Sequence, residues 1–156
     1  IKITNTDTFK GPHQSMEPVW AGASLQHADS AMIMIHGRGA SAQSILTLAD
    51  ELDVPENMAL VAPQASGHTW YPYSFLAPTD QNQPGLNSGL QQIFNLITEL
   101  NEAGVPKEKI WLLGFSQGAC LLRLVRPHSS SASFKVHSHC SGSGSFSSIH
   151  CKSSEK

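Results

Sequence analysis

The pentapeptide Gly114-Phe115-Ser116-Gln117-Gly118 is the part of this sequence whose residue types and spacing could do chemistry. It follows directly on the apolar run 110–113. A strand that turns sharply into a helix can hold one serine in a strained conformation with its hydroxyl exposed, and flanking glycines let the chain pass without Cβ clashes. Such a turn, a nucleophile elbow, suits acyl transfer, in which the serine oxygen attacks a carbonyl carbon.

A serine that attacks an acyl group also needs hydrogen-bond donors for the oxyanion that develops. One donor in such sites is the backbone N–H of the residue after the serine, here Gln117, at the positive end of a helix. The other comes from a loop after an earlier strand, and His36-Gly37-Arg38-Gly39 follows the apolar run 31–35. The Arg38 N–H is therefore the expected second donor.

The acid and base that would activate Ser116 are not evident. After Ser116 the chain has 40 residues, with no aspartate and with Glu155 as the single glutamate. Asp80 precedes the serine in a loop, where a turn or contact with solvent is its expected role. We expect His36 to anchor the oxyanion loop through a ring hydrogen bond, and His68 to lie on the loop surface. The triad aspartate and histidine are thus predicted to be absent.

Apolar periodicity indicates the elements that must position this site. The wholly apolar run 31–35 is typical of a parallel strand that is buried on both faces, and the segments 58–61 and 109–113 are interpreted as two further buried strands. Helical spacing of apolar residues predicts helices at 41–52, 86–100 and 117–126, and a long loop rich in proline and aromatic residues covers 64–84. Alternation of strands and helices predicts an α/β fold, a parallel sheet with helices on both faces that ends soon after the elbow helix.

The composition changes at about Pro127. Of the 28 residues from Ser129 to Lys156, 12 are serine, and large apolar residues are few. Such a segment buries too little apolar surface to offset its ordering entropy, so we predict a disordered tail and an open outer edge on the 109–113 strand. The abruptness of the change favours a tail foreign to the domain, as after a frameshift or a mis-spliced end. The predicted organisation is an N-terminal extension (1–16), a partial domain (17–126) and the tail (127–156).

Three segments, at 36–39, 62–72 and 113–119, resemble the phospholipase/carboxylesterase family of α/β-hydrolases, which includes acyl-protein thioesterases. The resemblance extends over about residues 17–120. It implies an α/β-hydrolase-type sheet, Ser116 as nucleophile, and backbone N–H groups of Arg38 and Gln117 as the oxyanion hole. It also implies that substrate is bound by His36, Gly37, Trp70 and Tyr71, the two aromatic residues lining the acyl side.

The resemblance also shows what is missing. The family places its acid and then its histidine after two further strands. Two strand-and-crossover units need roughly 60 residues, more than follow Ser116 here.

Composition narrows the function classes. A formal charge of −2 gives no argument for binding nucleic acid, and the longest apolar run is far shorter than a bilayer span. The short apolar run predicts a soluble protein. The three cysteines have no C-x-x-C spacing and leave one unpaired in any disulfide scheme, so a reducing, cytoplasmic compartment is expected.

The arginine side chain of Arg38 is expected to pair with a carboxylate or to face solvent.

Three functional hypotheses remain open at the level of sequence. The first is a serine hydrolase acting on small acyl esters or thioesters, without metal or organic cofactor. The second is a catalytically incomplete remnant that at most binds acyl ligands. The third, metal binding by tail histidines and cysteines such as His137, His139 and Cys140, lacks the spacing of a known structural site.

Overall fold

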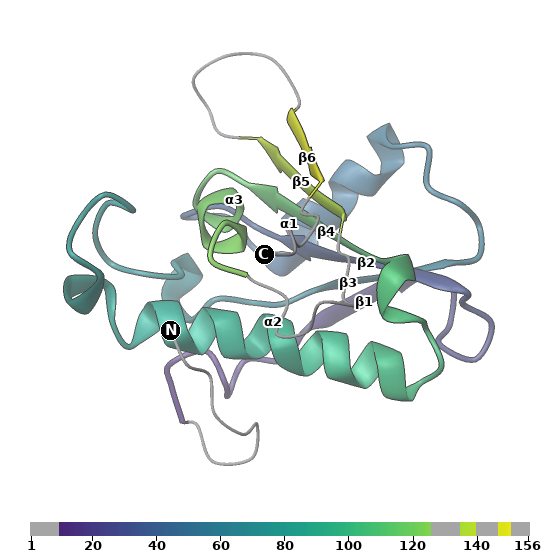
Figure 1. The fold of residues 1–156 in the computed structure, drawn as a ribbon, viewed down its shortest axis with the longest axis horizontal. Coiled ribbons are helices and arrows are strands. Elements are labelled where there is room, and N and C mark those ends of the chain that lie inside the picture. Colours follow the sequence, from purple (N-terminus) through teal and green to yellow (C-terminus); the bar gives the residue numbers. More distant parts are fainter. Residues whose placement is uncertain (1–9, 126–134, 140–146, 151–156) are drawn as a thin grey trace, which may run out of the picture.

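The protein folds around a six-stranded sheet whose strands lie in the order β1-β3-β2-β4-β5-β6 (Figure 1). The computed structural model describes residues 10–125, 135–139 and 147–150, and the last two ranges for their backbone alone. The strands are β1 (Val19–Gly22), β2 (Ser30–Ile35), β3 (Met58–Ala62), β4 (Ile110–Phe115), β5 (Lys135–His139) and β6 (Ser147–His150). The pairs β3–β2, β2–β4 and β4–β5 are parallel, whereas the outer strands β1 and β6 run antiparallel to their neighbours.

Helices cover both faces of the sheet, as the sequence predicts. One face carries α2 (Gly85–Glu102) and α3 (Gln117–Leu122), and the other carries α1 (Ala42–Leu46), which continues as the 3₁₀ turn η1 (Thr47–Glu51). In Figure 1, α2 and α3 lie in front of the strands and α1 behind them. Three further 3₁₀ turns, η2 (Ser66–His68), η3 (Thr79–Asn82) and η4 (Lys107–Lys109), lie in the connections.

Alternation along the central strands divides the core into two layers. On β2, Ile33 and Ile35 face the larger cluster beneath α2 and α3, whereas Met34 faces the smaller cluster beneath α1. Successive strand residues point to opposite faces, so an apolar run with no alternation is what a sheet covered on both sides requires. The three segments that the sequence predicts as buried strands therefore form β2, β3 and β4.

The end of α2 follows from local chemistry. Gly104 has φ +105, a conformation that side chains rarely adopt, and the Val105 N–H donates to Leu100 O at 3.0 Å. This is the bonding of a Schellman cap, and Val105 and Leu100 are both fully buried beside it. The glycine after the apolar stripe thus ends the helix at the place that the sequence indicates.

Two expectations about the sheet are corrected. The sequence predicts a purely parallel sheet, but β1 pairs antiparallel with β3 and makes the sheet mixed. The expected absence of a strand after the elbow helix is also wrong, because β5 pairs in parallel with β4 from Trp111 to Phe115. The open outer edge of β4 is therefore covered by backbone of the tail.

The physical reason lies in the backbone. The tail has few apolar side chains to bury, but a buried strand at a sheet edge also offers a row of unpaired N–H and C=O groups, which any extended segment can satisfy. The remaining tail residues lie outside the described part of the chain, and the domain boundaries stay predictions. No helix of the described residues has the length and apolar character needed to cross a bilayer.

Candidate active site

Ser116 lies at the turn between β4 and α3 with φ 50° and ψ −113°. This region is sparsely populated by residues other than glycine and costs about 1–3 kcal/mol, so it persists only where the surrounding structure enforces it. Ser116 is half-buried and occupies the N-cap position of α3, where its side chain makes no hydrogen bond to the helix. Its backbone has the strained strand-to-helix geometry that the pentapeptide predicts.

The two glycines of the pentapeptide are required by close backbone approach. A Cβ on Gly114 would lie 2.8 Å from the Ala119 backbone. A Cβ on Gly118 would collide with the carbonyl oxygens of Ile35 and His36 at the end of β2. Gly118 therefore lets the start of α3 pack directly against the end of β2, where the oxyanion loop begins.

The loop after β2 reaches the serine. A Cβ on Gly37 would lie 3.3 Å from the Ser116 Cβ and 3.3 Å from Phe115 O. The loop is folded by the Ala40 N–H, which donates to Gly37 O at 3.2 Å, and by the Gly39 N–H, which donates to His68 O at 2.7 Å. Residues 36–39 and the elbow thus share one end of the sheet.

The backbone N–H groups of Gln117 and Arg38, the two expected oxyanion donors, lie in different backbone settings. The Gln117 N–H, at the first residue of α3, has no carbonyl partner within its helix. Within the described residues, the Arg38 N–H makes no hydrogen bond, although the N–H groups of Gly39 and Ala40 beside it do. Both N–H groups are therefore available to a ligand.

His36 anchors this loop from inside the protein. Its side chain is fully buried; Nε2 accepts a hydrogen bond from the Ala65 N–H at 3.1 Å, so Nδ1 carries the proton that it donates to Gly37 O at 2.8 Å. Burial lowers the pKa of His36, which favours the neutral ring that this pattern needs. His36 therefore holds the loop from inside the core.

Trp70 and Tyr71 lie behind the oxyanion loop. Trp70 is 0% exposed and Tyr71 is 3% exposed, and both belong to the larger core cluster. The Trp70 Nε1–H donates to His36 O at 2.8 Å. Gly37 is buried as well, so direct contact of these residues and His36 with substrate stays a prediction.

The side chain of Gln117 has a function that the sequence analysis missed. Gln117 is 6% exposed; its Oε1 accepts from the Trp70 N–H at 2.9 Å and its Nε2 donates to Tyr71 O at 2.8 Å. One side chain thus ties the elbow to the loop 64–84, hereafter the aromatic loop. Only an amide offers a donor and an acceptor side by side, which is the signal that could have pointed to this role.

Arg38 is exposed, in agreement with the second of the two expectations for its guanidinium, contact with solvent. It pairs with no carboxylate among the described residues and instead donates to Pro72 O at 3.0 Å and Tyr73 O at 2.9 Å. It also lies 6.0 Å from the centre of the Tyr71 ring. Backbone carbonyls at a turn offer a fork-shaped donor two acceptors at fixed spacing, and this explains the choice.

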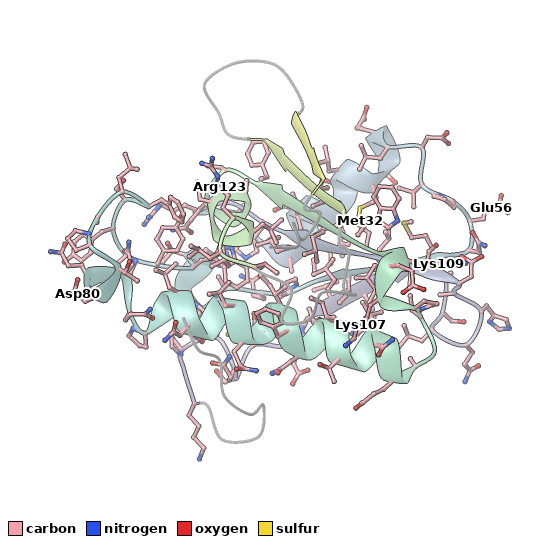
Figure 2. The ribbon with its side chains drawn as sticks, in the orientation of Figure 1. Met32, Glu56, Asp80, Lys107, Lys109 and Arg123 are labelled. Atoms are coloured by element: carbon pink, nitrogen blue, oxygen red, sulfur yellow. The ribbon has the colours of Figure 1, made fainter. Side chains whose placement is uncertain are left out.

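The absence of a triad base stays a prediction. Among the described residues, no histidine or carboxylate hydrogen-bonds to Ser116. Asp80 is exposed in η3, toward the C-terminal end of the 64–84 loop (Figure 2). Its carbonyl accepts a hydrogen bond from the Gln83 N–H. His68 is exposed, as predicted. The backbone of His139 pairs with Phe115, beside Ser116, but the side chains of the tail lie outside the described structure.

Comparison with known proteins shows which family the chain belongs to. The model of the Phospholipase/Carboxylesterase family matches residues 22–141. The chain belongs to the phospholipase/carboxylesterase family. The resemblance carried by the three sequence segments is thereby confirmed.

Individual relatives support the family assignment. The chain is 31% identical over 121 residues to acyl-protein thioesterase 1 of Eremothecium gossypii, an alignment that covers 67% of this chain and 51% of the relative. A solved phospholipase/carboxylesterase from Dyadobacter fermentans is 43% identical with a TM-score of 0.68, covering 72% of this chain and 53% of that one. The structure of esterase PE8, at 23% identity and a TM-score of 0.53, covers 67% of this chain and 54% of its own and shares the fold. The chain spans about half the length of these relatives.

Proposed function

We propose that this member of the phospholipase/carboxylesterase family is built for serine-dependent hydrolysis of small acyl esters or thioesters. The observation that carries the proposal is the approach of Gly37 to Ser116, with Ser116 itself at φ 50°. A strained serine beside a loop whose Arg38 N–H makes no hydrogen bond among the described residues is an arrangement with little structural benefit of its own. The relatives' names, esterase and acyl-protein thioesterase, support the same reaction class.

In the proposed reaction, Ser116 Oγ attacks the acyl carbonyl carbon and the carbonyl oxygen becomes an oxyanion. The Arg38 and Gln117 N–H groups donate to that oxygen, which is more negative in the transition state than in the substrate, so they lower the barrier. The C–O or C–S bond to the leaving group breaks, and the alcohol or thiol departs with the proton that the Ser116 hydroxyl gave up. Water then attacks the acyl-enzyme, which releases the acid and restores the serine.

The second candidate is a family member that binds acyl groups without turning them over. It is favoured by the fact that Ser116 has no histidine or carboxylate partner among the described residues. Without a base, the serine proton has no acceptor and the hydroxyl stays a weak nucleophile. Loss of triad members costs roughly 10⁴- to 10⁶-fold in kcat.

An esterase assay separates the two. Hydrolysis of p-nitrophenyl butyrate is measured for the chain, for Ser116→Ala, for the surface control Ser24→Ala, and for a version in which a complete family C-terminal half replaces the residues after Cys120. We expect serine-dependent turnover in the completed version. In the chain itself we expect kcat to be lower by a factor of about 10⁴ or more. An inactive completed version would contradict the hydrolase proposal.

Full activity of the unaltered chain would change the interpretation of the tail as a segment without catalytic residues. If the unaltered chain matched the completed version and lost its activity with Ser116→Ala but not Ser24→Ala, a base would have to come from the tail. His137, His139 and His150 would then be the residues to replace next.

A further inference from the structure

His13, which precedes the predicted domain, lies beneath the oxyanion loop. It is 2% exposed although it comes before β1. Its backbone is anchored on α2, since the His13 N–H donates to Ser88 Oγ at 2.9 Å and its carbonyl accepts from Gln92 Nε2. The segment that carries His13 is therefore packed as part of the domain.

The ring of His13 joins two points of the aromatic loop. Nδ1 accepts from the Ser66 N–H at 3.0 Å, so Nε2 carries the proton and donates to Trp70 O at 2.9 Å. The ring also meets the indole of Trp70 edge-on, with centroids 5.2 Å apart. The imidazole thus sets the position of the Trp70 backbone and of its side chain.

Trp70 carries this contact to both oxyanion segments. Its Nε1–H donates to His36 O, one peptide before Gly37, and its indole lies 5.0 Å from the His36 ring. On the other side, its N–H donates to Gln117 Oε1. A Cβ on Gly89 of α2 would lie 3.1 Å from the indole, so the indole has little room to shift.

We propose that His13 is a positioning residue for the oxyanion hole: through Trp70 it holds the segments that carry the Arg38 and Gln117 N–H groups at a constant separation. His13 touches no reacting atom. The catalytic consequence rests on the proposed function, whereas the structural link does not. Donors that act on a developing oxyanion affect kcat, so their displacement lowers kcat and leaves KM unchanged.

A matched pair of substitutions isolates the link. In His13→Gln the side-chain amide reaches the place of Nε2 and keeps the donation to Trp70 O, whereas in His13→Asn it reaches only the place of Nδ1. NMR measures the solvent exchange of the Trp70 indole N–H against the Leu112 amide in β4, which reports global opening. The amide signals of Arg38 and Gln117 report the donors themselves.

In His13→Asn we expect the Trp70 indole to exchange about tenfold faster relative to Leu112, and the Arg38 and Gln117 signals to move. His13→Gln should stay within about threefold of the unaltered chain. In the version with a completed C-terminal half, His13→Asn should lower kcat about tenfold at unchanged KM, with His13→Gln restoring most of it.

Equal exchange and unmoved amide signals in His13→Asn would overturn the proposal, as would equal loss of Leu112 protection in both variants, which marks a merely structural role. If the completed version shows no serine-dependent turnover, the proposed function fails. The NMR comparison then still decides the inference, since it requires no catalysis.

Discussion

Gln117 serves the site through two parts of the residue. Its backbone N–H is the expected oxyanion donor, whereas its side chain holds the aromatic loop through Trp70 N and Tyr71 O. The G-x-S-x-G pattern leaves this position free, so the motif alone assigns the side chain no role. The structure explains why an amide fits there.

We predict that Gln117→Ala lowers the free energy of unfolding by about 2–3 kcal/mol. The substitution leaves the buried Trp70 N–H without its acceptor and removes the Gln117 Nε2 donation to Tyr71 O, which keeps the Thr69 hydroxyl as a donor. A buried unsatisfied polar group costs about 1–3 kcal/mol, and a lost hydrogen bond adds about 1 kcal/mol. Urea denaturation measures the change. Gln81→Ala, at an exposed glutamine, is the control and should stay within about 0.5 kcal/mol; similar effects for the two variants would contradict the role assigned to Gln117.

At the scale of elements, the site depends on how closely α3 approaches the end of β2. That contact brings the elbow and the oxyanion loop together, and Gly118 is the residue that permits it. The parallel register of β2 and β4, with Ile35 beside Gly114, places both loops at one edge of the sheet. In open α/β sheets ligands bind at this edge, beyond the carboxyl ends of the strands.

We predict that Gly118→Ala costs about 3 kcal/mol or more, because its methyl group would meet two backbone carbonyls that cannot rotate away. Gly67→Ala is the matched control: Gly67 has φ +61 and open space around its Cβ position, so only about 1–2 kcal/mol of backbone strain is expected. Urea denaturation of the two variants tests this. Should Gly67→Ala prove the more damaging, packing of α3 on β2 would not be what the glycine provides.

At the scale of the whole molecule, two buried neutral histidines join the N-terminal segment, the oxyanion loop and the aromatic loop. Burial lowers the pKa of both His13 and His36 below 6.5. Each ring uses one nitrogen as an acceptor, so protonation would break a hydrogen bond as well as place a charge in the core. The unfolded chain therefore binds protons more readily than the folded protein in this range.

We predict that the protein is less stable at pH 5.5 than at pH 7.5. The stabilisation is complete above about pH 6.5 and is lost as the pH falls from there through the lowered pKa values, at up to about 1.4 kcal/mol per pH unit for each ring. Thermal unfolding across this interval measures it. His13→Gln, which cannot be protonated, should flatten the dependence, and a midpoint that is constant in the unaltered chain would contradict the prediction.

The sequence by itself determined the features that depend on neighbours along the chain. Unbroken apolar runs specify the buried strands β2, β3 and β4, an apolar stripe ending in Gly104 specifies α2, and glycines around Ser116 specify the turn. These are local consequences of side-chain period and backbone freedom. The family resemblance carried by the same segments is confirmed by the match of the family model to residues 22–141.

Only the tertiary structure decided what depends on segments far apart in the chain. His13 and Trp70 meet across 57 positions, and Gln117 and Trp70 across 47, with no local pattern to announce either contact. The pairing of β5 with β4 likewise arises because an edge of unpaired backbone groups accepts a strand of almost any composition. Side-chain pattern predicts which segments become buried, but hydrogen-bond partners are chosen by the packed arrangement, because only there do the polar groups lose water and require one another.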